Sequence, residues 1–128
     1  MIDRIDHLVL TTRDLQACIR FYTEALGMRL VEFDTPTGRR LALHFGNQKI
    51  NLHVYGAEYE PRAHLPVPGA LDLCFIASVP LAEAMRRLEA AGVEIVEGPV
   101  RRTGAVSALH SIYVRDPDLN LVEIAVPG

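Results

Sequence analysis

Hydrophobic and polar residues alternate in several short stretches of the chain, and two longer stretches have apolar residues at helical spacing. Alternation over about 4–8 residues predicts half-buried β-strands, because successive side chains of a strand point to opposite faces. Apolar residues three and four positions apart predict a helix with one apolar face. The predicted strands are residues 5–11, 28–33, 40–45, 49–55, 70–77, 93–97, 106–115 and 120–126.

The predicted helices follow the first and the fifth of these strands. Thr12 or Asp14 can cap the first helix, and Gly27 is suited to end it. The second helix carries its apolar residues over 81–88 and ends at Gly92. Residues 98–104 are predicted to be a loop that carries two adjacent arginines, Arg101 and Arg102.

The pattern occurs twice. Residues 6–32 align with residues 71–97 without a gap, and seven aligned positions are identical, where about two are expected by chance. Each copy runs strand, helix, three strands, which predicts an α+β fold of two tandem βαβββ modules in one domain, 1–128. Module one covers 4–56, a linker covers 57–69, and module two covers 70–127. Alternatively, the two segments look alike only because common residues meet the same physical requirements.

Composition limits the function classes. The chain has 128 residues, 49% hydrophobic and 23% charged, which is typical of a globular domain. A net charge of −3 gives no electrostatic reason to bind nucleic acid or a membrane surface. No apolar run reaches the ~20 residues that span a bilayer, so we expect a cytoplasmic protein. Cys18 and Cys74, which lack metal or redox spacing, are expected to be buried, reduced thiols.

Polar residues on the strand faces opposite the helices are the candidates for chemistry. The helix-facing sets are apolar, so the opposite sets should line the concave side of a curved mixed sheet and form a metal- or ligand-binding cavity there. His7, Asp72 and Glu123 belong to these sets, and His53 shares a face with Asn51. Nitrogen and oxygen donors of this kind suit a divalent first-row metal.

Each candidate also has an ordinary structural interpretation. A single histidine on a strand, such as His7, is often a surface or hydrogen-bonded core residue. Asp72 can cap the linker, and His53 can simply flank a loop. Glu123 can be solvated at a sheet edge, but it lies among apolar residues, where a carboxylate is costly to bury unless it is paired or bound to metal.

Several stretches together resemble a known superfamily. Asp6–Thr11, Phe21–Met28 and Arg115–Glu123 are similar to the vicinal oxygen chelate superfamily, which includes glyoxalase I, extradiol dioxygenases, fosfomycin-resistance proteins and bleomycin-binding proteins. Gln48–His53 and Pro68–Phe75 are most similar to the glyoxalase-domain-5 type. The resemblance covers nearly the whole chain and implies a fold of paired βαβββ modules.

The resemblance implies, by position, that His7 and Glu123 are metal ligands. Asn51 stands where glyoxalase I has a carboxylate, and Asp72 stands where it has a histidine. Whether Asn51, His53 or Asp72 completes the ligand set therefore remains open, and the metal ligands we predict are His7, His53, Asp72 and Glu123. Asn51 cannot act as a general base, which leaves His53 as the candidate base.

One turn departs from the superfamily pattern. Leu119 stands where the resembling Asp-Pro-Asp-Gly-Asn turn has glycine. A left-handed backbone disfavours residues with a Cβ, so we expect this turn to differ locally.

The resulting expectation is an enzyme in which a divalent Mn, Fe, Co, Ni or Zn ion chelates two neighbouring oxygens of a small substrate and acts as a Lewis acid. The reaction would be of the lyase, isomerase, transferase or dioxygenase type, with His53 and Glu123 as catalytic residues, and glyoxalase I activity itself is not expected. One alternative is a metal-free small-molecule binding or resistance protein, and another is a domain whose polar face is a hydrogen-bonded network. Arg62, His64 and the Arg101–Arg102 pair are candidates for holding an anionic group. A homodimer is the expected assembly.

Overall fold

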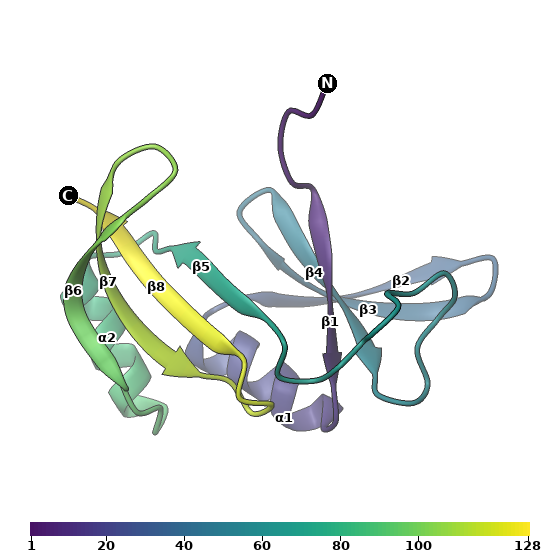
Figure 1. Cartoon of the computed structure of the whole chain (residues 1–128). Coiled ribbons are helices and arrows are strands. Elements are labelled where there is room, and N and C mark those ends of the chain that lie inside the picture. The colour runs from purple at the N-terminus through teal and green to yellow at the C-terminus, as the bar shows by residue number, and fades with distance from the viewer. The chain divides into compact units, whose positions relative to one another are not determined.

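The computed structural model describes residues 1–128, which form two compact units, Met1–Pro68 and Gly69–Gly128. Each unit contains one strand, a helical segment and three further strands, in that order along the chain (Figure 1). The first unit contains the predicted module one, and the second contains the predicted module two.

Module one is a four-stranded mixed sheet with the strand order β1-β4-β3-β2. The strands β1 and β4 are parallel, and the other neighbouring pairs are antiparallel. Its elements are β1 (His7–Thr12), α1 (Leu15–Arg20), the short π-helix η1 (Phe21–Ala25), β2 (Arg29–Thr35), β3 (Gly38–Phe45) and β4 (Gln48–Val54).

Module two repeats this topology with the strand order β5-β8-β7-β6. Here β5 and β8 are parallel, and the other pairs are antiparallel. The same unusual order in both modules confirms the predicted α+β fold of two tandem βαβββ modules. The elements are β5 (Asp72–Ile76), α2 (Leu81–Ala90), β6 (Glu97–Thr103), β7 (Ala108–Arg115) and β8 (Leu121–Pro127).

The helix ends follow the sequence signals. Asp14 is the N-cap of α1, and its carboxylate accepts a hydrogen bond of 3.0 Å from the Ala17 amide. After η1 the chain turns at Gly27, whose φ of +76° is open to glycine at little cost. Gly92 follows α2 with a φ of +75°, so both predicted helix ends are confirmed.

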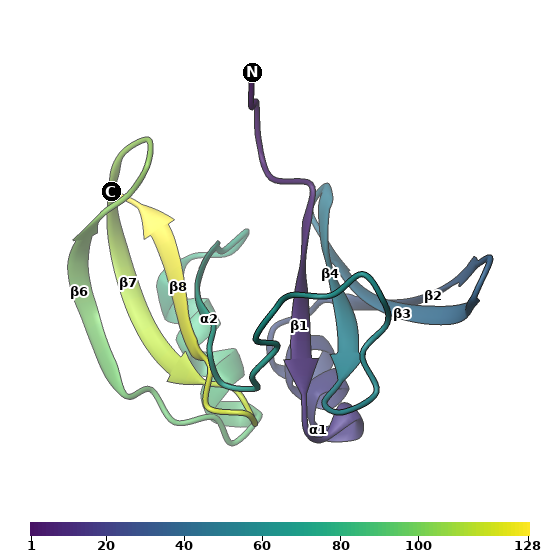
Figure 2. The same cartoon turned by 45° about the vertical axis from the view of Figure 1, so that its right-hand side comes forward.

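The core of each module lies on the helix-facing side of its sheet. In module two, Val122 of β8 and Val114 of β7 are fully buried, and Leu88 of α2 is almost fully buried. Figures 1 and 2 both show α2 running along one face of this sheet. The corresponding core of module one contains Leu10, Cys18, Tyr22, Leu43, Ile50 and Leu52.

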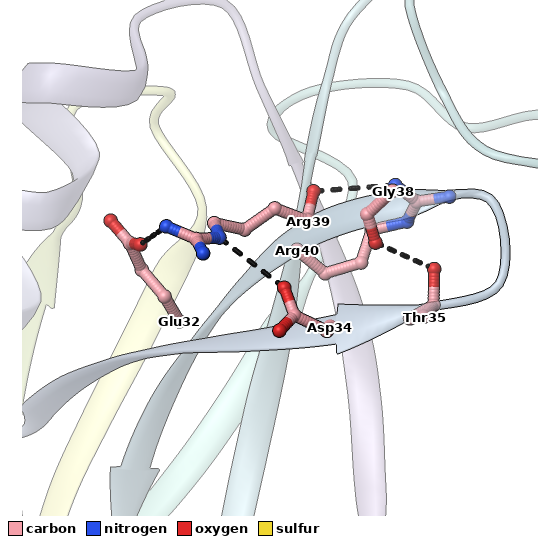
Figure 3. A network of polar contacts seen from close by, with 6 residues as sticks. All are labelled: Glu32, Asp34, Thr35, Gly38, Arg39 and Arg40. Carbon is pink, nitrogen blue, oxygen red and sulfur yellow. Dashed lines mark hydrogen bonds and ion pairs between the residues drawn. The ribbon is translucent and has the colours of Figure 1, made fainter.

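The β2–β3 hairpin of module one carries a polar network at its surface (Figure 3). Arg39 binds two carboxylates of β2, with Nη1 3.0 Å from Glu32 and Nε 3.3 Å from Asp34. Thr35 Oγ1 donates a 2.7 Å hydrogen bond to the Gly38 carbonyl and closes the turn. All three charged side chains are more than half exposed, so this network contributes little to stability.

The sequence prediction for residues 93–104 is wrong. Residues 93–96 are not a strand, and the segment with Arg101 and Arg102, predicted to be a loop, is strand β6. A Gly-Pro pair such as Gly98-Pro99 is typical of loops, but β6 is an edge strand and has a bulge between Glu97 and Val100. A bulged edge strand tolerates proline, because no neighbour needs its missing amide hydrogen.

Both cysteines are free. Cys18 is fully buried, as expected, but Cys74 is exposed, so that prediction is wrong. Cys74 alternates with the helix-facing Leu73 and Phe75 along β5 and therefore points to the opposite face of the sheet. No helix of the protein has the length and apolar character needed to cross a membrane.

Candidate functional site

The concave face of module two carries a row of polar side chains. Tyr113 of β7 and Cys74 of β5 both stand directly opposite Glu123, which lies on the strand between them, so the three side chains share one face. A cavity of about 660 Å³ lies over this face, within the range of small-molecule sites. It is lined by Asp72, Val96, Glu97, Arg102, Tyr113, Arg115, Leu121 and Glu123.

Glu123 is half-buried, and its carboxylate accepts a hydrogen bond from a neighbouring strand. The Ser111 hydroxyl, which is fully buried, donates a 2.6 Å hydrogen bond to Glu123 Oε2. Hydrogen bonds to an ionised carboxylate are short and stronger than neutral ones. Ser111 therefore fixes the orientation of the carboxylate at the wall of the cavity.

The Glu123 carboxylate also affects the pKa of Cys74. Partial desolvation of the thiol, and then the charge and hydrogen bonding of Glu123, raise the pKa of Cys74 to about 11. Asp72, two residues earlier on the same face, adds a smaller contribution of the same sign. Cys74 is thus a protonated thiol at neutral pH and, by this measure, a poor nucleophile.

Arg102 and Tyr113 also line the cavity and contact each other. Arg102 Nε donates a 2.9 Å hydrogen bond to the Tyr113 hydroxyl, and Arg102 Nη2 lies 3.6 Å from the Glu97 carboxylate. The bond to Tyr113 is the main cause that raises the pKa of Arg102. The cavity therefore holds a fixed positive charge beside its carboxylates.

The turn before β8 fixes the start of that strand. Asp116, which is almost completely buried, accepts hydrogen bonds of 2.9 Å from the Asp118 and Asn120 amides and of 2.8 Å from Asn120 Nδ2. Asn120 Oδ1 accepts the Leu71 amide at 2.9 Å and so ties the turn to β5. Leu119 has a φ of +69°, so leucine adopts the left-handed conformation that glycine would adopt more easily.

His7 lies on the edge strand of module one, with its side chain 45% exposed. Its Nδ1 is 2.9 Å from Asp6 Oδ2, and this hydrogen bond is the main cause that lowers the pKa of Asp6. With the proton on Nδ1, Nε2 keeps its lone pair for a ligand. A carboxylate behind a histidine is a common outer partner of metal-binding imidazoles.

His53 shares the face of His7 but lies elsewhere on it. His7 stands opposite Lys49, whereas His53 stands opposite Thr11, four residues further along. The His53 ring meets Tyr59 edge-on, at 5.3 Å between ring centroids. Desolvation is the largest of the causes that lower the pKa of His53, so the ring is mainly neutral at pH 7.

Asn51 occupies in module one the register position that Glu123 occupies in module two. It stands opposite Val9 and Ala42, where Glu123 stands opposite Cys74 and Tyr113. Asn51 Oδ1 is buried and has no hydrogen-bond partner.

The four predicted site residues divide between the two modules, and the two histidines of module one are not brought together. Asp72 and Glu123 line one cavity in module two, and His7 and His53 share a sheet face in module one. Within either module, no three His, Cys, Asp or Glu side chains lie close enough together to hold a metal ion by themselves. The individual donors still fit a divalent first-row metal: a carboxylate fixed by Ser111 and an imidazole backed by Asp6. The full ligand set stays a prediction.

Sequence reasoning missed Ser111 and Tyr113, and it named Arg102 only as a candidate for holding an anionic group. Ser111 and Tyr113 belong to the same alternating stretch and face Glu123. Alternation along 108–115, paired antiparallel with the last strand, is the signal that would have found them. Arg102 was assigned to a loop and so was not placed on any face.

A duplicated βαβββ module with a carboxylate-containing cavity on its concave face defines a protein of the vicinal oxygen chelate class. Residues 4–124 match the family described as the Glyoxalase/Bleomycin resistance protein/Dioxygenase superfamily, and the chain belongs to this superfamily.

Three known proteins illustrate the relationship. The chain is 54% identical over 125 residues to virulence protein STM3117 of Salmonella typhimurium, covering 98% of this chain and 85% of that protein. It is 53% identical over 121 residues to glyoxalase domain-containing protein RDO1 of Mycosarcoma maydis, covering 94% of this chain and 66% of that protein. The crystal structure of STM3117 superposes with a TM-score of 0.93 at 52% identity, covering 100% and 99% of the two chains. A lactoylglutathione lyase from Agrobacterium tumefaciens gives a TM-score of 0.70 at 25% identity, covering 98% and 94%.

Proposed function

We propose that this protein is a divalent-metal-dependent enzyme acting on a small molecule that is chelated through neighbouring oxygens. The observation that supports this most directly is the Glu123 carboxylate, held by the buried Ser111 hydroxyl at the wall of a cavity of about 660 Å³. A carboxylate is costly to desolvate, and metal binding offsets that cost. Membership of the superfamily agrees with this reading.

His7 and Glu123 are the proposed primary ligands, and Asp72 and His53 are the further candidates. A bound Mn, Fe, Co, Ni or Zn ion would supply Lewis-acid stabilisation of negative charge that develops on the substrate oxygens. Asp6 holds the His7 ring and sets its tautomer. Ser111 and the turn at Asp116 hold Glu123 in place.

His53 is the proposed general base when it is not a ligand. Desolvation lowers its pKa below the ordinary value of 6.5, so it is neutral at pH 7 and can accept a proton. Asn51, by contrast, has no basic group. The proposed reaction is of the lyase, isomerase, transferase or dioxygenase type. A proton transfer in it would use His53, because Asn51 cannot accept the proton.

We further propose that the enzyme is a cytoplasmic homodimer. The strands β1 and β5 each lie at the edge of their sheet with one side unpaired by the module itself. Exposed apolar side chains on these strands, Val9 and Ile76, favour a covered surface beside each edge. Sedimentation velocity over a range of concentrations tests this part separately.

The test of the metal site is metal content, measured by mass spectrometry on untagged protein after reconstitution with each candidate ion. We expect near-stoichiometric metal in the wild type and a loss in both His7→Ala and Glu123→Ala. His110→Ala and Glu94→Ala are the matched controls, and they should keep the metal. A folded wild type that binds no metal, or variants that retain it, would overturn the enzyme proposal in favour of a metal-free binding protein.

A further inference from the structure

Arg102 is the feature of the module-two cavity that the metal proposal does not use. It lies on β6 beside the cavity, with its side chain 40% exposed. Its strand neighbour Arg101 stands opposite His110 and so points to the other face of the sheet. The two adjacent arginines therefore occupy opposite faces of the sheet, and Arg101 is the more exposed.

Three polar contacts orient the Arg102 guanidinium, whose carbon also lies 5.4 Å from the centre of the Tyr113 ring. Nε donates to the Tyr113 hydroxyl at 2.9 Å, Nη1 donates to the Arg101 carbonyl at 3.2 Å, and Nη2 lies 3.6 Å from Glu97. The last distance is that of an ion pair, longer than a hydrogen bond. Nη2 therefore keeps its N–H groups for another acceptor, while the group as a whole is already oriented.

The contacts of Arg102 differ from those of Arg39, which forms a surface ion pair. Arg39 reaches its two carboxylates at 3.0 and 3.3 Å, within hydrogen-bonding distance (Figure 3). Arg102 instead makes its shortest bond to a neutral phenol and leaves Glu97 at a longer distance. An arginine fixed by a neutral partner keeps more of its charge for an incoming anion.

Tyr113 adds a second donor at the same place. Its oxygen accepts the Arg102 Nε hydrogen, so its own hydroxyl hydrogen is free to donate toward the cavity that it lines. A guanidinium edge next to a hydroxyl donor matches the two oxygens of a planar carboxylate.

We propose that Arg102, oriented by Tyr113, binds a carboxylate group of the substrate. The substrate of the proposed enzyme is thus a small oxygenated acid. This assignment of the substrate class rests on the proposed function. The cavity lining has three carboxylates and two guanidiniums, so a divalent cation at Glu123 would reverse its net sign. Carboxylate binding and cation binding should therefore strengthen each other, by the same factor in both directions.

The direct test is calorimetric titration of metal-stripped protein with malonate, with neutral malonamide as the comparison ligand, both at constant ionic strength. We expect malonate to bind and malonamide not to bind. Arg102→Gln should weaken malonate binding about tenfold or more, Arg102→Lys should weaken it less, and Tyr113→Phe should lower it by a few-fold. Arg101→Gln, the matched control on the other face, should bind as the wild type does.

Equal weakening in Arg101→Gln and Arg102→Gln, equal binding of malonamide, or no malonate binding at millimolar concentration would overturn the inference. Thermal melting of each variant shows whether it is folded. If Arg102→Gln does not fold, Arg102→Lys, which keeps the positive charge, replaces it in the comparison. Metal content of Arg102→Gln should stay at the wild-type level. A protein that binds no metal but binds malonate through Arg102 would refute the proposed function and leave this subsite standing.

Discussion

Replacing Glu123 by glutamine should make Cys74 more reactive. The change keeps the shape of the side chain and removes the negative charge next to the thiol. In the wild type the pKa of Cys74 is about 11, against an ordinary value of 9.0. At pH 8 only about one thiol in a thousand is then ionised.

The expected size of the effect follows from the causes of this shift. Desolvation is the largest cause and stays in the variant, whereas the charge and the hydrogen bonding of Glu123 are removed or weakened. A fall of about one pKa unit raises the thiolate fraction about tenfold at pH 8. A less basic thiolate is also a weaker nucleophile, so the rate of reaction with an aromatic disulfide reagent should rise about three- to fourfold.

The assay is the pH–rate profile of that reaction between pH 7 and 11. Cys18 is fully buried, so the fast phase belongs to Cys74 and should be absent from Cys74→Ala. Glu94→Gln is the matched control and should leave the profile unchanged. A wild-type midpoint near 9, or an identical profile in Glu123→Gln, would refute the assignment of Glu123 as the charge that faces Cys74.

Two further predictions concern stability. Asn120→Ala removes a hydrogen bond to the buried Asp116 carboxylate and one from the Leu71 amide. It should therefore lower the free energy of unfolding by about 3 kcal/mol, or the Tm by roughly 10 °C in calorimetry. A loss as small as that of the turn control Asn47→Ala would contradict the role of this network. His53 has a lowered pKa in the folded state, through desolvation offset by Glu58 and aided by Arg40, so the folded protein binds fewer protons than the unfolded chain just below pH 6.5 and should lose stability as the pH falls. Urea midpoints between pH 5 and 7.5 should show this slope in the wild type and a flatter one in His53→Gln, and equal slopes would count against it.

The topology could be predicted from the sequence because the signals for it are local and occur twice. Alternation placed His7 and Glu123 on the faces opposite the helix-facing residues, and Asp14, Gly27 and Gly92 marked helix ends by their backbone chemistry. These features depend on neighbours within one strand or one turn.

The remaining features depend on contacts between segments that are distant in the sequence. Arg102 was misplaced because Gly98-Pro99 reads as a turn, and only pairing with β7 reveals a bulged strand there. Cys74 was expected to be buried by residue type, although alternation with Leu73 and Phe75 places it on the face opposite the helix, where it is exposed. Leu119 was expected to alter its turn, yet the bonds made by Asp116 and Asn120 hold the left-handed backbone in place.

The two modules differ in an informative way at one ladder position. Glu123 and Asn51 occupy equivalent places in the ladder, but the first has Ser111 as a donor and the second has a buried oxygen with no partner. Because the same ladder position occurs in both modules, one sheet can present a charged side chain there while the other presents a smaller neutral one. The repeated topology thus separates two demands: both sheets use the same framework, but only one of them has to stabilise a carboxylate at this position.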